Sequence, residues 1–263
     1  MRQAKTTRSR AIAELLCGAL FFACRSCEYS KTQRHEEKRT RSIRPCDIEF
    51  TLNGKVIPHS HPLLHKADYV IITFGPQKAD IHQDEAIPQE ATDDAELNPV
   101  WHWAHTIRRL MSYPDYDPTW PVYTYYDHRT NKYSNIRSYE ILSTIRACVK
   151  SIGYAVLGFH SSEVGTHSNR GAFAMMLYLS GQPIVAMMKI GRWASDSFLD
   201  YIEKQVLTFS AGVSTKMLHS NTFFNFPVKA YQKEGETTSE CPQFHSSRSK
   251  TPIHGRHISL RSK

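Results

Sequence analysis

The dipeptide Asn53-Gly54 constrains the fold of this chain more than any other short segment. It separates an alternating apolar segment, 47–52, from the β-branched segment 55–57. A two-residue type I′ turn needs positive φ at both positions, which Asn and Gly adopt most readily, so this pattern predicts an antiparallel hairpin. A β-branched segment at 69–74 and a return strand at 85–87 extend the hairpin to a small antiparallel sheet.

Helical patterns account for much of the remaining chain. Apolar residues recur at intervals of three and four within 11–24, which is the period of an amphipathic helix. Pro99 and Pro183 suit the first turn of a helix, whereas Gly153 and Gly191 suit a helix end. We expect helices over 11–24, 98–113, 139–152, 167–179, 184–190 and 198–207, the last capped by Ser195 or Asp196. The sequence therefore predicts an α+β fold, mostly helical with a small antiparallel sheet.

The segments between these elements have loop compositions. Residues 31–45 form a charged connector, 89–98 an acidic loop, and 114–135, rich in Pro, Tyr and Asp, a surface loop. Large apolar residues become few beyond about residue 228, which predicts a disordered end to the chain. We therefore expect one domain over 11–218 and a basic, disordered tail over 219–263.

Composition argues against several classes of protein. A hydrophobic content of 40% is enough to build a core, and a formal net charge of +8 favours polyanionic partners, nucleic acid first. The apolar run near the N-terminus contains Glu14 and is too short to span a bilayer, so we expect no membrane segment. Cys24 and Cys27 form a C-x-x-C pair that no second pair follows, so we expect reduced cysteines, no metal and no cofactor.

His167 and Arg170 are the first candidates for a chemical site. At this spacing they share one face of a helix, so an imidazole and a guanidinium can both point at one phosphate. Metal-free cleavage of a phosphodiester also needs a second guanidinium, a nucleophile and a proton donor for the leaving oxygen. The chain supplies Arg25 at the end of the first predicted helix, Lys78 between two predicted strands, and Tyr201 on the last predicted helix.

Simpler explanations exist for some of these residues. Arg25 could cap the end of a helix and form an ordinary pair with Glu28. Lys78 lies in a turn, where exposed lysines are common, and Lys55 and Lys66 are alternatives for its role.

Tyr201 differs from the apolar residues near it because the predicted core does not need it. Tyr201 lies on the flank of the apolar stripe of its predicted helix, so the core does not require an aromatic ring there. Trp193 would ordinarily be a core residue. The apolar residues of the two preceding helices are expected to be core: Met175, Met176, Ile184, Val185, Met187, Met188 and Ile190.

Three motifs occur in one order along the chain. FFACRSCEY is followed by the Asp47-Ile48 strand and a hairpin; GTHSNRGAFAMMLYLSGQP and GRWASDSFLDYI come later. These motifs resemble the R-x-S-E-L, H-x-L-R and G-[H/W]…Y elements of the tyrosine recombinases, the phage-integrase family. The third motif is most similar to the eukaryotic Crypton-type branch. The resemblance covers about residues 11–218 and implies a catalytic domain of the DNA breaking-rejoining enzyme type.

The resemblance implies how the candidates would hold a scissile phosphate. Arg25 and Arg170 would clamp the phosphate, while Glu28 would orient the site rather than react. Trp193 would pack against the site and hydrogen-bond to it.

The resemblance also implies a reaction and its partners. Tyr201 would form a 3′-phosphotyrosyl link, Lys78 would protonate the 5′ oxygen, and His167 would donate a hydrogen bond or manage the proton of the nucleophile. The protein would then be a site-specific recombinase or integrase that acts on double-stranded DNA as a homo-oligomer, a synaptic tetramer. A DNA substrate in a eukaryotic-looking branch implies the nucleus.

The chain departs from the family pattern in three places. Asn169 stands where an apolar residue is usual, and Trp193 is one residue nearer to Tyr201 than in many phage members. The chain begins about two dozen residues before Arg25, so we expect no N-terminal core-binding domain, weak nonspecific DNA binding and poor cleavage. Two alternatives stay open: an inactive DNA-binding derivative of a mobile-element recombinase, and a type IB topoisomerase-like enzyme.

Overall fold

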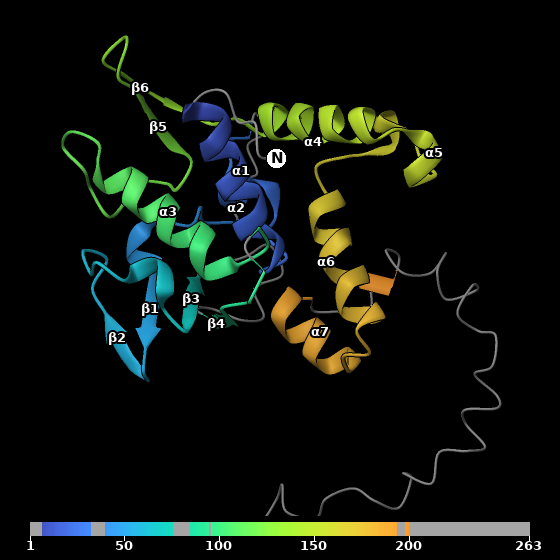
Figure 1. Ribbon diagram of the computed structural model, residues 1–263, viewed down its shortest axis with the longest axis horizontal. Helices are drawn as coiled ribbons and strands as arrows, with labels where there is room; N and C mark the ends of the chain where they lie inside the picture. The colour runs from blue at the N-terminus through green and yellow to red at the C-terminus, as the bar shows by residue number, and fades with distance from the viewer. Residues whose placement is uncertain (1–6, 33–39, 76–84, 95, 194–197, 200–263) are drawn as a thin grey trace, which may run out of the picture. The chain divides into compact units, whose positions relative to one another are not determined.

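The computed structural model describes residues 7–32, 40–75, 85–94, 96–193 and 198–199 of the chain (Figure 1). The chain divides into two units, Met1–Ala211 and Gly212–Lys263, and every described residue belongs to the first. Helices and small antiparallel sheets make up the described part, so the α+β prediction is confirmed.

The main sheet has the strand order β2-β1-β3-β4, and each neighbouring pair is antiparallel (Figure 1). Its strands are β1 (Ile48–Leu52), β2 (Lys55–Ile57), β3 (Tyr69–Phe74) and β4 (Glu85–Glu90). Asn53 and Gly54 have φ values of 52° and 71°, and Leu52 pairs with Lys55. The predicted two-residue hairpin is therefore confirmed, and β4 continues three residues beyond its predicted end at Ile87.

Helices α1 (Thr7–Leu20) and α3 (Pro99–Met111) pack against each other, and α3 also contacts β3 and β4. The side chain of Asn98 caps α3, and Pro99 occupies its first turn as predicted. Trp103 is fully buried and donates its indole N–H to the carbonyl of Gly18 at 3.1 Å. A Cβ at Gly18 would lie 3.0 Å from that indole nitrogen, so glycine permits the close approach of the two helices.

The prediction of a surface loop over 114–135 is wrong, because this segment contains a second antiparallel hairpin. Its strands are β5 (Thr124–Asp127) and β6 (Lys132–Asn135). Tyr126 pairs with Tyr133 across the hairpin, with ring centroids 4.8 Å apart. Arg109 on α3 donates to the carbonyls of Val122 and Thr124 at 3.0 and 2.8 Å. Contacts with the preceding helix and between aromatic rings thus outweigh the loop-like composition.

The remaining helices are α2 (Ser26–Tyr29), α4 (Ser138–Ile152), α5 (Tyr154–Leu157), α6 (Ser168–Leu179) and α7 (Ile184–Gly191). Of these, α4, α6 and α7 agree closely with the predicted ones, whereas the one-turn helices α2 and α5 were not predicted. Gly153 ends α4 with a φ of 89°, a value that favours glycine. Short 3-10 turns cover Pro45–Asp47, Leu64–Lys66 and Ser161–Glu163. Of the predicted helix over 198–207, only 198–199 are described.

The prediction that seven named apolar residues of α6 and α7 are core is wrong in part. Met187 is fully buried, but Met176, Ile184 and Val185 are exposed, Val185 to 76%. Met175, Met188 and Ile190 are partly buried against a small cluster. The buried members of this cluster are Ala23, Phe173, Ala174, Met187, Trp193 and Phe198. In the described part of the chain, each of these two helices buries only one face.

Within the described residues, the helices are either too short or too polar for a bilayer-spanning segment.

Candidate functional site

The chain reverses direction between α1 and α2, and this corner is the centre of the candidate site. Helix α1 ends at Leu20 rather than at residue 24, and Ala23 takes a left-handed conformation with a φ of 46°. The N–H of Cys24 donates to the carbonyl of Ala19 at 3.1 Å and closes the corner. The carbonyl of Ala23 faces two arginines from the far end of the described chain.

Arg170 joins α6 to this corner. Its side chain is buried, with 4% of the residue exposed. Nη1 donates to the Ala23 carbonyl at 2.6 Å, and Nη2 donates to the Gly191 carbonyl at 2.6 Å. Because both terminal nitrogens donate to backbone oxygens, Arg170 holds the end of α7 against the α1–α2 corner.

Arg25 and Glu28 form the second part of the site. Arg25 directly precedes α2, and its backbone N–H donates to Glu28 Oε2 at 2.7 Å. Its Nη1 lies 3.4 Å from Glu28 Oε1, and 24% of its side chain is exposed. The simpler explanation of an Arg25–Glu28 pair is therefore correct, but Glu28 is buried and has a further partner.

That further partner is Arg192, which the sequence analysis missed. Its Nη2 donates to Glu28 Oε2 at 2.9 Å and also lies 3.5 Å from the Ala23 carbonyl. The guanidinium carbon lies 3.4 Å from the centroid of the Phe74 ring. The only signal in the sequence was a charged residue that directly follows an apolar helix, between Gly191 and Trp193.

Arg192 also carries unused hydrogen-bonding capacity. It is 5% exposed and has a φ of 54°. Among the described residues, its buried Nε and Nη1 atoms have no hydrogen-bond partner. A buried donor without an acceptor is costly, and more so on a charged group, so an anion at this place would stabilise the guanidinium.

Trp193 lies over the guanidinium of Arg170. The guanidinium carbon is 4.5 Å from the ring centroid, a distance typical of a cation–π contact. Phe173 and Phe198 lie beside the indole, with centroid distances of 6.1 and 5.6 Å. A Cβ at Gly191 would overlap the Trp193 ring, so glycine is required there. Trp193 is thus both a core residue and part of the site.

His167 and Asn169 occupy the first part of α6. His167 is the exposed residue before the helix, and its side chain caps no backbone N–H. His167 is therefore exposed while Arg170 is buried. The structure does not place the two side chains beside one common phosphate position. Asn169, which departs from the family pattern, donates to the Leu16 carbonyl at 3.4 Å and hydrogen-bonds to Tyr29.

The charges of the site leave an excess of positive charge. Arg25 and Arg192 contact the one carboxylate, that of Glu28, while Arg170 donates to the Ala23 carbonyl that Arg192 also approaches. Burial raises the pKa of the Cys24 thiol and of the Tyr29 hydroxyl, so both groups stay neutral at pH 7. The cluster can therefore hold an anion without losing its own ion pair.

The structure brings together four of the predicted residues: Arg25, Glu28, Arg170 and Trp193. Arg192 joins them, and His167 lies one turn away from Arg170 along the chain. Lys78 and Tyr201 lie outside the described residues. In the described part, no group of three or more His, Cys, Asp or Glu side chains could hold a metal ion.

Comparison of the chain with protein-family models and with curated proteins gave no match.

Proposed function

We propose that this protein binds double-stranded DNA and breaks and rejoins its strands through a 3′-phosphotyrosyl intermediate. One observation carries the proposal: Arg170 and Arg192 meet at the Ala23 carbonyl, and Arg192 and Arg25 share the carboxylate of Glu28, so three guanidiniums and one carboxylate gather at this corner. Guanidinium groups are the side chains best suited to grip phosphate oxygens. The order of the sequence motifs around these arginines supports the same reaction.

The proposed reaction needs no metal. The phenolic oxygen of Tyr201 attacks phosphorus, a P–O bond to Tyr201 forms, and the bond to the 5′ oxygen breaks. Lys78 gives a proton to the leaving 5′ oxygen, and His167 takes the proton of the phenol. In the reverse step, a 5′ hydroxyl of another strand attacks the phosphotyrosine and releases Tyr201.

Within this proposal, the arginines differ in their tasks. Arg25 is partly exposed and would meet the phosphate first, whereas the open Nε and Nη1 donors of Arg192 would stabilise the developing charge. Glu28 orients both guanidiniums through its two oxygens. We also propose that strand exchange takes place in a synaptic tetramer, since two duplexes must be cut together. The proposed place of this reaction is the nucleus.

A second candidate function is DNA binding without cleavage, as in an inactive derivative of a mobile-element recombinase. The state of Arg170 favours it, because its two terminal nitrogens donate to the backbone carbonyls of Ala23 and Gly191 in a buried environment. A phosphate clamp requires at least part of that guanidinium to turn toward DNA. The basic cluster would still attract DNA with Arg170 in its present position.

Covalent trapping distinguishes the two candidates. A nicked duplex whose short 5′ fragment diffuses away after cleavage is mixed with the full chain, and the products are separated on a denaturing gel. Wild type should give a protein–DNA adduct, and Tyr201→Phe should give none while it binds DNA with the same affinity. DNA binding without any wild-type adduct contradicts cleavage and supports the second candidate. Relaxation of supercoiled DNA without sequence preference would instead indicate a type IB topoisomerase-like enzyme.

A further inference from the structure

Arg41, Arg44 and Asp47 form a second group of charged side chains, between α2 and β1 in the chain. Arg41 Nη2 donates to Asp47 Oδ1 at 3.0 Å. Arg44 Nη2 donates to the same oxygen at 2.8 Å, and Arg44 Nε donates to Oδ2 at 2.9 Å. Two guanidiniums thus share one carboxylate, so this group, the Asp47 cluster, carries a net positive charge.

Arg44 alone neutralises Asp47, and the surplus charge belongs to Arg41. Asp47 is 7% exposed, and the backbone N–H of Arg44 also donates to its Oδ2, at 3.0 Å. Arg41 adds a single hydrogen bond, and 36% of its side chain is exposed. Its guanidinium donates to no other residue in the part of the chain that the structure describes. Arg41 therefore presents open donors and a positive charge to solvent.

A glycine at the end of β3 gives the Arg41 guanidinium its place. Gly75 is buried and directly follows β3, and a Cβ there would lie 2.5 Å from Arg41 Nε and 2.6 Å from its Cζ. The preceding residue, Phe74, provides the ring against which Arg192 lies, with 3.4 Å between the guanidinium carbon and the ring centroid. Arg41 and Arg192 thus lie against consecutive residues at the end of one strand.

A backbone hydrogen bond connects the same segment to α2. The N–H of Ile43 donates to the Glu28 carbonyl at 2.9 Å. Glu28 is the residue whose carboxylate pairs with Arg25 and Arg192 in the candidate site. The backbone beside Arg41 is therefore held by the candidate site itself, and the Asp47 cluster adjoins that site on two sides, at α2 and at β3.

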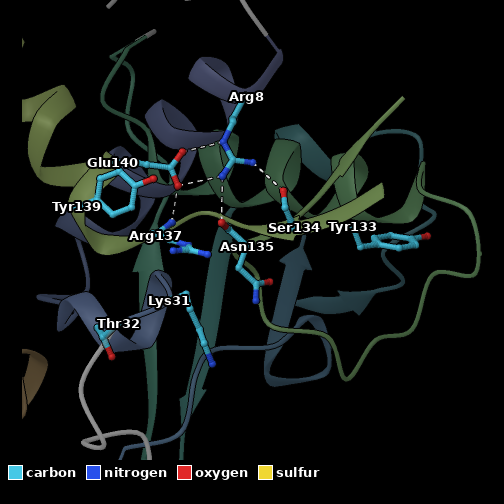
Figure 2. Close-up of a pocket in the computed structure, with 9 residues that line it drawn as sticks. All are labelled: Arg8, Lys31, Thr32, Tyr133, Ser134, Asn135, Arg137, Tyr139 and Glu140. Carbon is cyan, nitrogen blue, oxygen red and sulfur yellow. Dashed lines mark hydrogen bonds and ion pairs between the residues drawn. The ribbon is translucent and has the colours of Figure 1, made fainter. Parts of the chain in front are cut away.

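A surplus of guanidiniums is not general to the ion pairs of this protein. Arg8 and Glu140 meet at a cavity of about 700 Å³ between α1 and the start of α4 (Figure 2). Arg8 Nε and Nη2 donate to the two oxygens of Glu140 at 2.8 and 2.9 Å, so there one guanidinium is matched by one carboxylate. In the Asp47 cluster, as at Glu28, two guanidiniums share one carboxylate.

We propose that the Asp47 cluster binds a second phosphate of the DNA backbone, beside the phosphate held by the arginines of the candidate site. Successive phosphates of one strand follow every 3.4 Å or so along the duplex axis, roughly, so a strand at the candidate site presents further phosphates close by. Arg41 donates to the second phosphate, while Arg44 keeps Asp47 neutralised. Such contacts fix the register and orientation of the duplex and take no part in the reaction. The inference rests on the proposed function, of which it needs DNA binding but not cleavage.

The salt dependence of DNA binding by the full chain tests this contact. The probe is a fluorescent duplex, and fluorescence anisotropy gives its dissociation constant at a series of salt concentrations. Each phosphate contact contributes about 0.9 to the slope of log affinity against log salt concentration. Arg41→Gln should therefore reduce that slope by about 0.9. It should also weaken binding about tenfold at low salt, because a charge-assisted hydrogen bond is lost.

Matched variants separate this contact from general charge and from folding. Arg129→Gln removes the same charge from an exposed position in the β5–β6 hairpin and should keep the wild-type slope. Arg41→Lys retains the charge and should also keep the slope. Urea unfolding should show Arg41→Gln close to wild type, since Arg44 still neutralises Asp47.

The outcomes distinguish this inference from the proposed function. If DNA binds and Arg41→Gln keeps the wild-type slope, or loses no more than Arg129→Gln, the inference is overturned and the proposed function stands. A reduced slope in Arg41→Gln without any wild-type adduct supports the inference and contradicts cleavage. A wild type that binds no DNA overturns both. A loss of trapped adduct at saturating DNA as large as that of Arg25→Gln overturns the inference, because Arg41 would then hold the reacting phosphate.

Discussion

Arg192 donates a hydrogen bond to Glu28 at 2.9 Å, although 164 positions separate the two residues in the chain. Their side chains are 2% and 1% exposed, so both charges are almost completely removed from water. Buried charges that lose their partner are strongly destabilising, whereas exposed pairs contribute little. This pair is therefore the contact in the site whose removal should be easiest to measure.

Breaking the Arg192–Glu28 pair should destabilise the fold. Glu28→Gln and Arg192→Met should each lower the free energy of unfolding by about 3–5 kcal/mol, because each takes from a buried charge the oppositely charged group that lies closest to it. The double variant should cost less than the sum of the single variants by about 0.5–3 kcal/mol. Urea unfolding followed by circular dichroism measures all four proteins. Strictly additive costs would contradict a direct pair.

Gly191→Ala should disturb Trp193, because the added Cβ would overlap the indole ring. We expect a loss of about 1–3 kcal/mol in stability, the usual cost of overpacking, together with a shift in tryptophan fluorescence. Gly165→Ala is the control, since a Cβ there meets no atom within 4 Å. The control should stay within about 0.5 kcal/mol of wild type. A shift of equal size in both variants would contradict the packing argument.

His105 should make the protein less stable in acid. Burial, and then the nearby Arg108, lower the pKa of His105 from 6.5 to about 4. The unfolded chain therefore binds a proton more readily than the folded one, and stability that is complete above pH 6.5 falls as the pH drops toward 4. His105→Phe keeps the contact with the Trp101 ring and should flatten the dependence of unfolding free energy on pH over this range.

Urea unfolding at a series of pH values between 4 and 7 measures this dependence. The matched control is His128→Phe, since His128 is exposed and also lies against an aromatic ring, that of Tyr126. The control should keep the wild-type slope. If His105→Phe keeps that slope as well, the acid sensitivity has another origin.

Arg25→Gln should reduce the yield of the trapped protein–DNA adduct by about 100-fold or more, because a donor aimed at the charge of the transition state is lost. Glutamine preserves a polar side chain beside Glu28. Arg129→Gln removes the same charge from an exposed position in the β5–β6 hairpin and should change the yield little. Adduct yields on a denaturing gel compare the two variants, and similar losses in both would point to general charge attraction.

Local signals in the sequence account for most of the secondary structure. Asn53-Gly54 predicts its hairpin because the turn depends on two residues and their φ values. The β5–β6 hairpin could not be predicted in this way, because Arg109 and a pair of tyrosine rings hold it. The exposed face of α7 was missed for a related reason: an apolar helix does not reveal how many of its faces find partners.

The candidate site shows the same division. Arg25, Arg170 and Trp193 could be selected because their spacing and order are visible in the sequence, and the structure brings them together. Arg192 could not be selected from the sequence, because its role in the site depends on its burial beside Glu28, which is a property of the folded chain. The buried state of Arg170 was equally hidden, since nothing in the H-x-x-R spacing indicates that backbone carbonyls accept its donors.

The left-handed corner at Ala23 has a consequence for how the protein is made. Its carbonyl accepts from Arg170, 147 positions later in the chain. During synthesis, Arg25 and Glu28 leave the ribosome long before Arg170 and Arg192, which complete the site. Contacts between such distant residues form slowly, because a long loop must first close. The site therefore matures only after residue 193 has emerged, and an incomplete nascent chain carries no assembled arginine cluster.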